Sequence, residues 1–466
     1  MTGLLEGLRV IQMGHVAAIP TAGSLLAAGF KNLGMDLQVT PVEKEPRKRG
    51  IWISLDDTCS LGEEGYELVI TPKKVTLRSL KPAGLFYGVQ TLLQLLPQGA
   101  VTDTVILPSG TIRDYPRYAY RGAMLDVARH FFKPADVKRF IDLMASYKMN
   151  YLHLHLADDQ GWRIEIKSWP NLALHGGSTQ VGGGAGGYYT QEEYAELVAY
   201  AQARHVTVVP EIDMPGHTNA ALASYPELNC SGKAPALYTG TQVGFSTLCT
   251  NQEITYQFIS DVFKELTALT PGPYLHMGGD ESHVTRIEDY IPFVNRVHSI
   301  IRGYGKIPMG WDDIAVASLQ PGTVAQNWAK DELALKAAAQ GAKLVLSPAR
   351  KAYLDMKYDS TTTLGLKWAG YIEVDTAYTW DPDQIVPGLD PKMILGIEAP
   401  LWSETVTNMK EIEYLVFPRL AGYAEIGWTP ASLRSWEEYR TRLASHGKWM
   451  ESMGIHFYRS PRIDWK

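Results

Sequence analysis

Two adjacent acids, Asp280 and Glu281, end the run HMGGDE at 276–281, directly after a short apolar segment and two glycines. Cleavage of a glycosidic bond needs an acid to protonate the leaving oxygen and a negative group to support positive charge at the anomeric carbon. Adjacent acids are usually solvated surface residues, but a position directly after an apolar strand places this pair at the mouth of a packed element. We therefore interpret the pair as a candidate site for the cleavage of sugars.

Adjacency restricts the mechanism that these two acids can support. Retaining glycosidases ordinarily hold two carboxyl groups about 5 Å apart across the sugar ring, an arrangement better suited to acids on different strands. If Glu281 acts on the glycosidic oxygen, Asp280 can face the other side of the ring only by acting on a substituent, such as a 2-acetamido group. Two alternatives stay open: a two-carboxylate glycosidase with Glu404 or Asp213 as nucleophile, and a sugar-binding protein without catalysis.

The elements that must position these acids follow a repeated pattern from residue 118 onward, in which a short apolar strand precedes a helix. Eight such units predict an α/β fold of the (β/α)8 TIM-barrel type over 118–466, with an open doubly wound sheet as the alternative. Active sites of such barrels lie where the strands end, at the C-terminal face. The predicted strands are 122–127, 150–156, 206–212, 274–277, 307–311, 324–328, 343–346 and 393–397, with helices such as 134–148, 190–204 and 254–269 between them.

Residues 1–117 alternate helical and extended patterns, which predicts a small α+β domain ahead of the barrel. This stretch holds no cluster of histidines, cysteines or paired acids that could form a site. The segment 114–117 has the composition of a linker, so we place the domain boundary near residue 117. The helical patterns lie near 21–29 and 85–96, and the extended ones at 50–55, 66–70 and 74–77.

Acids, tryptophans and a few basic residues recur after the predicted barrel strands. Such a mixture suits a sugar, whose C–H faces stack on aromatic rings while its hydroxyls bond to carboxylates and arginine. Four other tryptophans, at 162, 169, 380 and 428, are better explained as core residues. The candidates at the strand ends are Arg129, Asp158, Asp213, His217, Asp280, Glu281, Trp311, Trp328, Tyr353, Asp355, Trp402 and Glu404.

Four motifs give the chain a family resemblance: HMGGDE at 276–281, RGAMLD at 121–126, RH at 129–130 and PEIDMPGH at 210–217. Together they resemble the glycoside hydrolase family 20 β-N-acetylhexosaminidases, over a stretch from about 121 to 428. The segment GLFYGVQTL at 84–92 is also similar to the end of that family's small N-terminal domain. The resemblance therefore covers both expected domains.

This resemblance implies an exo-acting, retaining hydrolase that removes terminal non-reducing N-acetylglucosamine or N-acetylgalactosamine from a glycan or chitooligosaccharide. In that family the substrate's own acetamido oxygen attacks the anomeric carbon and forms an oxazolinium ion, so the enzyme supplies no nucleophile. By carry-over, Asp280 orients the acetamido group and stabilises its positive charge. Tyr353 hydrogen-bonds the acetamido oxygen, and Glu281 serves as acid and then as base.

The resemblance also implies how the sugar is held. Arg129 would grip the 3- and 4-hydroxyls, while Asp355 and Glu404 would hold the outer hydroxyls. Trp368 would stack on the next sugar as a platform for the leaving group, although a packing role suits it comparably well. The wall around the N-acetyl group would be formed by Trp311, Trp328 and Trp402.

A supporting polar shell is implied for Asp158, Asp213 and His217, with Asp213 near Asp280 and His217 paired to a carboxylate. Structural hydrogen bonding is the competing interpretation. For His217, a supporting role in the site and a purely structural role are equally favoured. His153 and His155 fall on one face of a strand without a third ligand at suitable spacing, so they are expected to be core histidines. The family needs no metal, and we predict no metal and no cofactor.

Composition limits the other functional classes. A formal net charge of -6 and a pI near 6.1, with scattered Lys and Arg, make nucleic acid an unsuitable partner. No apolar stretch approaches the roughly 18 to 20 residues of a membrane span. The segment 1–9 lacks the pattern of a signal peptide, so a cytoplasmic location is expected unless a signal was removed.

Two of the three cysteines, Cys230 and Cys249, bracket a stretch with the composition of a long loop, which a disulfide could close. From the residues alone, two free buried thiols are slightly favoured, because three cysteines make neither a disulfide scaffold nor a metal-ligand pattern. The family resemblance supports the disulfide instead. It also favours a secreted or periplasmic origin.

Overall fold

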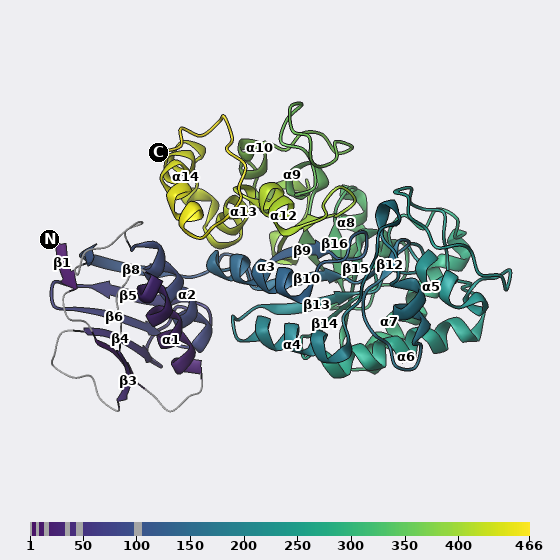
Figure 1. The fold of residues 1–466 in the computed structure, drawn as a ribbon, viewed down its shortest axis with the longest axis horizontal. Helices are drawn as coiled ribbons and strands as arrows, with labels where there is room; N and C mark the ends of the chain where they lie inside the picture. The colour runs from purple at the N-terminus through teal and green to yellow at the C-terminus, as the bar shows by residue number, and fades with distance from the viewer. Residues whose placement is uncertain (1, 6–8, 14–17, 33–37, 43–49, 97–104) are drawn as a thin grey trace.

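The computed structural model describes residues 2–5, 9–13, 18–32, 38–42, 50–96 and 105–466. In Figure 1 the small N-terminal domain, drawn in purple and blue, lies beside a larger barrel domain. The barrel is closed by eight parallel strands that alternate with helices. The expected α/β fold, a TIM barrel preceded by a small α+β domain, is therefore confirmed, and the open doubly wound sheet is excluded.

The barrel closes where its last strand pairs with its first. β18 and β9 run parallel in register from the pair Gly396 and Tyr120 to the pair Leu401 and Leu125. Both faces of these strands are covered, since β9 is buried at every position, which is usual for parallel strands beneath helices. All eight predicted strands occur: β9 (Tyr120–Asp126), β10 (Tyr151–His155), β13 (Thr207–Glu211), β14 (Tyr274–His276), β15 (Ile307–Trp311), β16 (Val324–Asn327), β17 (Lys343–Leu346) and β18 (Ile394–Leu401).

Amphipathic helices form the outer layer of the barrel (Figure 1). In α3, for example, the buried side chains recur at Val137, Phe140, Ile141 and Met144, the spacing of one helical face. The helices of this domain are α3 (Pro134–Ser146), α4 (Gln191–Gln202), α5 (Asn219–Ser224), α6 (Glu253–Leu269), α7 (Ile287–Gly303), α8 (Asp331–Ala339), α9 (Ala349–Ala352), α10 (Val374–Tyr378), α11 (Pro382–Ile385), α12 (Met409–Val416), α13 (Arg419–Trp428) and α14 (Trp436–Ser452). A two-residue pairing of β11 (Ala157–Asp158) with β12 (Gly161–Trp162) shapes the loop after β10.

The small domain is a six-stranded sheet with strand order β3-β2-β4-β6-β5-β8, against which α1 and α2 pack. The sequence predicted β4, β5, β6 and both helices, but neither the inner strand β2 nor the edge strands β3 and β8. The edge strand β3 contains Pro41, and the edge strand β8 has one apolar residue among GTIRD, so neither shows the alternation of a half-buried strand. The elements are β1 (Thr2–Leu5), β2 (Arg9–Met13), α1 (Ala18–Asn32), β3 (Gln38–Val42), β4 (Gly50–Leu55), β5 (Tyr66–Ile70), β6 (Lys74–Ser79), α2 (Pro82–Gln94), β7 (Val105–Pro108) and β8 (Gly110–Asp114).

The connection between the domains is short. β8 ends at Asp114 and β9 begins at Tyr120, and we propose the domain boundary within this connection, near residue 117. Within the described ranges, no helix has both the length and the apolar character needed to cross a bilayer.

Candidate active site

The turn after β14 carries the two adjacent acids into the mouth of the barrel. Gly278 and Gly279 adopt φ values of +67° and +104°, and Glu281 itself has a φ of +45°. A Cβ on Gly278 would lie 1.8 Å from Oδ1 of Asp213, so only glycine fits there. A non-glycine residue in the left-handed region costs about 1–3 kcal/mol and is typical of functional sites. This turn therefore holds Glu281 in a conformation that the surrounding structure must impose.

Both acids face the same histidine. Nε2 of His217 lies 3.8 Å from Oδ2 of Asp280 and 3.5 Å from Oε2 of Glu281, while Nδ1 lies 3.1 Å from Oδ1 of Asp158. Burial alone would lower the pKa of His217, but the charges of Asp158 and Asp213 outweigh it and raise the pKa well above its usual value. A buried imidazolium therefore links the two adjacent acids to Asp158.

The two adjacent acids differ in protonation. Burial, reinforced by the charge of Glu281, raises the pKa of Asp280 to about 7, although His217 opposes the shift. Glu281 is less buried, and its interaction with the charged His217 outweighs desolvation and lowers the pKa of its carboxyl. In the empty site the proton therefore prefers Asp280, and the negative charge prefers Glu281.

Asp213 lies close to Asp280, with one atom of each and of His217 within 4.8 Å of one another. Its Oδ1 accepts a hydrogen bond of 3.0 Å from the backbone N–H of Gly279, and its buried Oδ2 has no partner among the described residues. Burial, followed by the charge of Asp280, raises the pKa of Asp213 well above its usual value. Burial and the nearby acid therefore disfavour the ionised form of Asp213 beside Asp280.

Arg129 follows β9 and lies on the opposite side of His217. Its Nη2 lies 2.7 Å from Oδ2 of Asp158, and its guanidinium lies 4.8 Å from the ring centroid of Trp402. Asp126 fixes the turn, because its Oδ1 accepts hydrogen bonds from the backbone N–H groups of Ala128 and Arg129 at 2.8 and 3.1 Å. Stacking and ion pairing together hold this planar donor group at the mouth.

Aromatic rings line the other side of the mouth. Trp311 and Trp402 have ring centroids 5.6 Å apart, and Tyr353 lies 6.3 Å from Trp402 and 5.7 Å from Trp368. Trp368 also lies 6.1 Å from Trp328 and is 56% exposed, whereas Trp311, Tyr353 and Trp402 are buried. The exposed position of Trp368 favours a binding surface over a packing role, while the other rings form an enclosed wall.

Two further acids at the mouth lack partners. Both carboxylate oxygens of Asp355 and Oε2 of Glu404 are buried without a hydrogen bond from any described residue. Burial, followed by the charge of Glu404, raises the pKa of Asp355 well above its usual value, and burial also raises the pKa of Glu404 despite the nearby Arg129. Buried acceptors without donors are costly, so these groups are suited to receive donors from a ligand.

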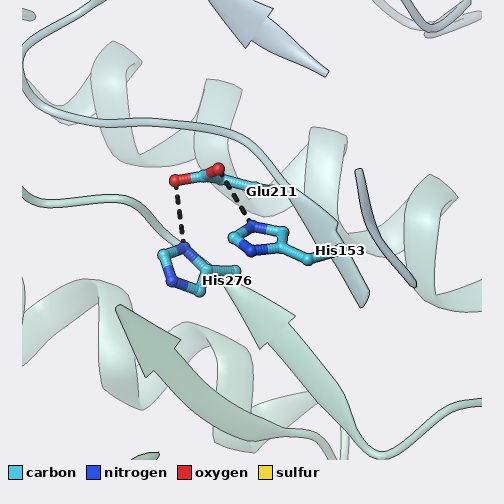
Figure 2. A group of neighbouring side chains, drawn as sticks. All are labelled: His153, Glu211 and His276. Atoms are coloured by element: carbon cyan, nitrogen blue, oxygen red, sulfur yellow. Dashed lines mark ion pairs between the residues drawn. The ribbon is translucent and has the colours of Figure 1, made fainter. Parts of the chain in front are cut away.

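Four groups of three buried His, Asp and Glu side chains could be considered as metal ligands among the described residues. In one of them, Glu211 lies between His153 and His276, as Figure 2 shows. Nδ1 of His153 also lies 2.9 Å from Oε1 of Glu398, and these two carboxylates outweigh desolvation and raise the pKa of His153 to about 9. An imidazolium has no lone pair for a metal, so this group is an ion-pair network.

The sequence-predicted site residues are found in one region, since contacts link Asp280, Glu281 and Asp213 through His217 to Asp158 and Arg129, and the aromatic wall to Arg129 through Trp402. Three residues of this region were given no individual role from the sequence: Asp126, Glu211 and Asp313, which accepts from Trp328 Nε1 at 3.0 Å. Each stands at a strand end beside a predicted site residue, and that position is the signal that could have identified it. His155 is buried as expected, but it is also part of the site because its Nε2 lies 2.8 Å from Oδ2 of Asp158.

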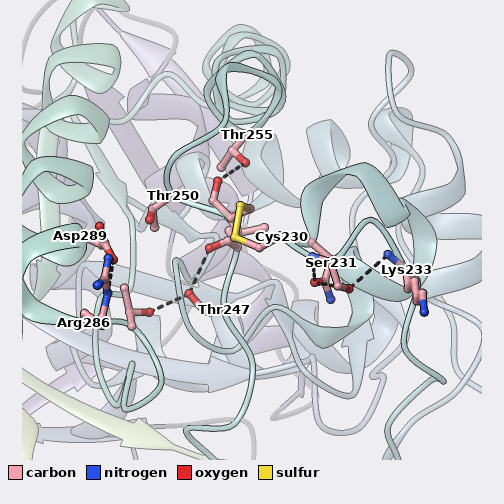
Figure 3. The surroundings of a disulfide bond; sticks show 12 residues. Cys230, Ser231, Lys233, Thr247, Thr250, Thr255, Arg286 and Asp289 are labelled. Carbon is pink, nitrogen blue, oxygen red and sulfur yellow. Dashed lines mark hydrogen bonds and ion pairs between the residues drawn. A yellow bond between two sulfur atoms is a disulfide. The ribbon is translucent and has the colours of Figure 1, made fainter.

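The structure joins Cys230 and Cys249, 19 residues apart, in a disulfide (Figure 3), so the two free thiols slightly favoured from the residues alone are not found. The four tryptophans assigned to the core, at 162, 169, 380 and 428, are indeed buried. Cys59 is the remaining cysteine and is partly exposed.

Comparison with known proteins places these observations in a family. The model of the glycosyl hydrolase family 20 catalytic domain matches residues 118–431, and the model of domain 2 of the same family matches residues 8–115. A β-N-acetylhexosaminidase of Cellulomonas fimi is 41% identical over 465 residues, covering 98% of this chain and 94% of that protein.

Solved structures agree. The family 20 β-N-acetylhexosaminidase of Streptomyces coelicolor A3(2) has a TM-score of 0.96 and 48% identity, covering 100% of this chain and 96% of that one. A mutant β-hexosaminidase of Streptomyces plicatus in complex with the product GlcNAc has a TM-score of 0.95 and 49% identity, covering 100% of this chain and 95% of that one. The chain therefore belongs to glycosyl hydrolase family 20 and is a β-N-acetylhexosaminidase.

Proposed function

We propose that the enzyme acts from the non-reducing end of glycans or chitooligosaccharides. It releases terminal N-acetylglucosamine or N-acetylgalactosamine with retention, through an oxazolinium intermediate formed by the substrate. The observation that carries this proposal is that Asp280 and Glu281 are neighbours on one turn and both face His217. Acids in that position cannot oppose each other across a sugar ring, so a group of the substrate must supply the nucleophile. The GlcNAc held by the Streptomyces plicatus mutant supports the sugar class.

In the first step the acetamido carbonyl oxygen attacks the anomeric carbon while the bond to the leaving oxygen breaks. Glu281 gives its proton to that oxygen, so the products are an alcohol and a bicyclic oxazolinium ion. Asp280, whose Oδ1 is buried and without a partner, accepts the acetamido N–H and stabilises the positive charge. The Tyr353 hydroxyl donates a hydrogen bond to the acetamido oxygen and fixes the direction from which that oxygen attacks.

In the second step water attacks the anomeric carbon from the side that the leaving group vacated. The Glu281 carboxylate takes a proton from that water, the oxazolinium ring opens, and the acetamido group is restored. Two inversions at the same carbon give net retention. His217, which lies 3.5 Å from Glu281 and 3.1 Å from Asp158, stabilises the carboxylate that alternates between acid and base.

The proposed first step needs a proton on Glu281, but the pKa values favour a proton on Asp280, because the pKa of Asp280 is raised and that of Glu281 is lowered. Substrate binding reverses the order. The acetamido N–H gives Asp280 a donor that favours its ionised form, while the sugar excludes water from Glu281 and disfavours its charge. Proton redistribution within the pair is thus part of binding, and a ligand without an acetamido group does not drive it.

Exo action follows from how the mouth is closed. Arg129, Asp355 and Glu404 present buried polar groups to the hydroxyls of one sugar, and the wall of Trp311, Trp328 and Trp402 encloses its N-acetyl group. The exposed Trp368 stands at the rim, where it offers a stacking surface to the sugar that leaves.

The direct test compares nitrophenol release from the β-N-acetylglucosaminide and from the β-glucoside, with the configuration of the first-formed sugar read by proton NMR. We expect strong preference for the acetamido substrate and β product first. Comparable rates on both substrates, or a glycosyl-enzyme trapped on Glu404 or Asp213, would return the enzyme to the two-carboxylate mechanism. An α product would exclude retention altogether.

A further inference from the structure

A carboxylate below the active site makes contacts that the proposed mechanism does not use. Glu211 ends β13, and its side chain is fully buried. Its Oε1 accepts from Trp311 Nε1 at 2.9 Å and lies 3.1 Å from Nδ1 of His276. Its Oε2 pairs with Nδ1 of His155 and lies 2.9 Å from Nε2 of His153. Four groups from three other strands thus converge on one side chain, as Figure 2 shows for the two histidines drawn there.

Two of these contacts, those with Trp311 and His155, each begin a line of connected side chains that leads into the active site. The indole that donates to Glu211 belongs to Trp311, which forms part of the aromatic wall with Trp402. His155 extends the other line, since its Nε2 lies 2.8 Å from Oδ2 of Asp158. Asp158 in turn contacts both Arg129 and His217. Side chains on both sides of the mouth therefore depend on one buried anchor.

The anchor is charged. Burial would raise the pKa of Glu211, but the charges of His155, His276 and His153 outweigh it and hold that pKa well below the usual range. A neutral amide could accept from Trp311 with its oxygen, but its NH2 group would then face the proton on His155 Nδ1. Donor would oppose donor in a fully buried place, and one of the two lines would have to move.

We propose that Glu211 is a positioning residue that orients both the Trp311 wall and the chain from His155 through Asp158 to Arg129 and His217. The role of Trp311 in holding the N-acetyl group rests on the proposed function. Glu211 touches no substrate and acts only through these neighbours. Displacing them by even about 1 Å is enough to reduce catalysis by about 10²-fold.

The chain offers a matched control in Glu398, which is as deeply buried as Glu211 and shares His153 with it. Its other partners are Tyr120, whose hydroxyl donates at 2.6 Å, and Gln326, whose amide donates at 2.7 Å. None of these three partners belongs to the proposed site. Glu398→Gln therefore disturbs the same polar core and reaches Glu211 only through His153, which belongs to neither line to the mouth.

The experiment measures kcat/KM on the nitrophenyl β-N-acetylglucosaminide, and the Kd of a thiazoline analogue of the oxazolinium ion, for wild type, Glu211→Gln and Glu398→Gln. Folding of each is verified by circular dichroism. We expect Glu211→Gln to lose about 10²-fold in kcat/KM, with a clear loss of thiazoline affinity, and Glu398→Gln to stay close to wild type in both. Equal losses in the two variants, or a folded Glu211→Gln with unchanged thiazoline affinity, would overturn the proposal.

Two further measurements keep the result decisive. If Glu211→Gln does not fold, Trp311→Phe removes the indole donor to Glu211, and unchanged thiazoline affinity in that variant would overturn the proposal. If Glu211→Gln and Trp311→Phe both fold, the variant that carries both changes should lose less activity than the product of the two single losses, because Glu211 and Trp311 act along one line. Failure of wild type to bind the thiazoline would instead contradict the proposed function, so the two failures are distinguishable.

Discussion

Buried carboxylates occur at two levels of this barrel, and their surroundings differ. In the barrel core, Glu211 and Glu398 have every oxygen paired, and the pKa of each is lowered because the nearby histidines outweigh burial. At the mouth, Asp280 and Asp355 are also buried and Glu404 is partly buried, yet each has at least one buried oxygen without a partner, and desolvation raises the pKa of each.

This contrast separates what holds the fold from what awaits the substrate. A buried carboxylate with all its donors supports the structure, whereas one without donors destabilises the empty protein. In the proposed function, the acetamido N–H and the sugar hydroxyls supply these missing donors. The acids without donors therefore lower the stability of the folded protein, and a bound sugar that supplies donors raises it. This is the usual relation between stability and function at active sites.

The largest expected effect follows from Glu281→Gln. Because Glu281 is the acid proposed to protonate the leaving oxygen, the variant should lose about 10²- to 10⁴-fold in kcat/KM on substrates with an alkyl or sugar leaving group. A dinitrophenyl leaving group needs no proton, so most of the loss should disappear with it. The check is a plot of rate against leaving-group pKa for wild type and variant. A uniform loss across all leaving groups would remove Glu281 from the role of acid.

Asp280→Asn comes next and should behave differently. The carboxamide cannot compensate the positive charge of the forming oxazolinium ion, so about 10²- to 10³-fold is lost in the first step. That loss should persist with the dinitrophenyl leaving group, because the missing interaction is with the acetamido group rather than with the leaving oxygen. Pre-steady-state release of the phenol measures the first step directly. Full activity of Asp280→Asn on the activated substrate would contradict the assignment.

The sequence predicted much of this site because position along a strand is readable in it. The acids after β14 and the tryptophans after β15, β16 and β18 follow apolar strands, and a closed barrel brings all strand ends together. The sequence did not reveal which acids are paired. Glu211 and Asp213 are two residues apart at the end of one strand, yet both oxygens of Glu211 have partners and Asp213 has one oxygen without a donor.

The edge strands of the small domain were missed for a related reason. A central strand such as β4 is apolar because both its faces are covered, whereas β8 is mostly exposed and shows no period. Pairing partners from distant parts of the chain, not local pattern, define both the edge strands and the ionised core.

The sugar-binding alternative without catalysis is excluded by membership of the hydrolase family.

A third prediction tests the contrast in stability itself. Asp355→Asn replaces a buried carboxyl, whose ionisation burial disfavours, by an amide that cannot ionise, so it should raise the temperature of unfolding at neutral pH while lowering kcat/KM by about 10- to 100-fold through lost hydrogen bonds to the sugar. The sign follows from linkage: a carboxyl whose folded pKa is raised loses stability as pH rises through it. Glu398→Gln should do the opposite and lower the unfolding temperature. Calorimetry of both variants without ligand decides, and a destabilised Asp355→Asn would contradict the comparison.

The pH dependence of kcat/KM should reflect one proton shared by Asp280 and Glu281, since that parameter reports the free enzyme. Above about pH 7 Asp280 loses this proton, none is left for the leaving oxygen, and activity falls. Below the lowered pKa of Glu281 both acids are protonated, Asp280 cannot accept the acetamido N–H, and activity falls again. In Asp280→Asn the basic limb should move to lower pH, towards the pKa of Glu281 alone. An unmoved limb would assign it to another group.

The smallest effect on activity is expected for the disulfide, which lies apart from both sets of carboxylates. Replacing Cys230 and Cys249 by serine opens a loop of 19 residues, which lowers the free energy of unfolding by about 3 kcal/mol through the greater freedom of the unfolded chain. The loop stays tied to the site by other bonds, since Ser246 Oγ accepts from the backbone N–H of Thr218 at 2.9 Å, beside His217. We therefore expect a lower unfolding temperature with unchanged kcat/KM. A matched loss in the reduced wild type would attribute the change to the bond itself, whereas a large loss of kcat/KM would mean that the disulfide, and not those hydrogen bonds, positions His217.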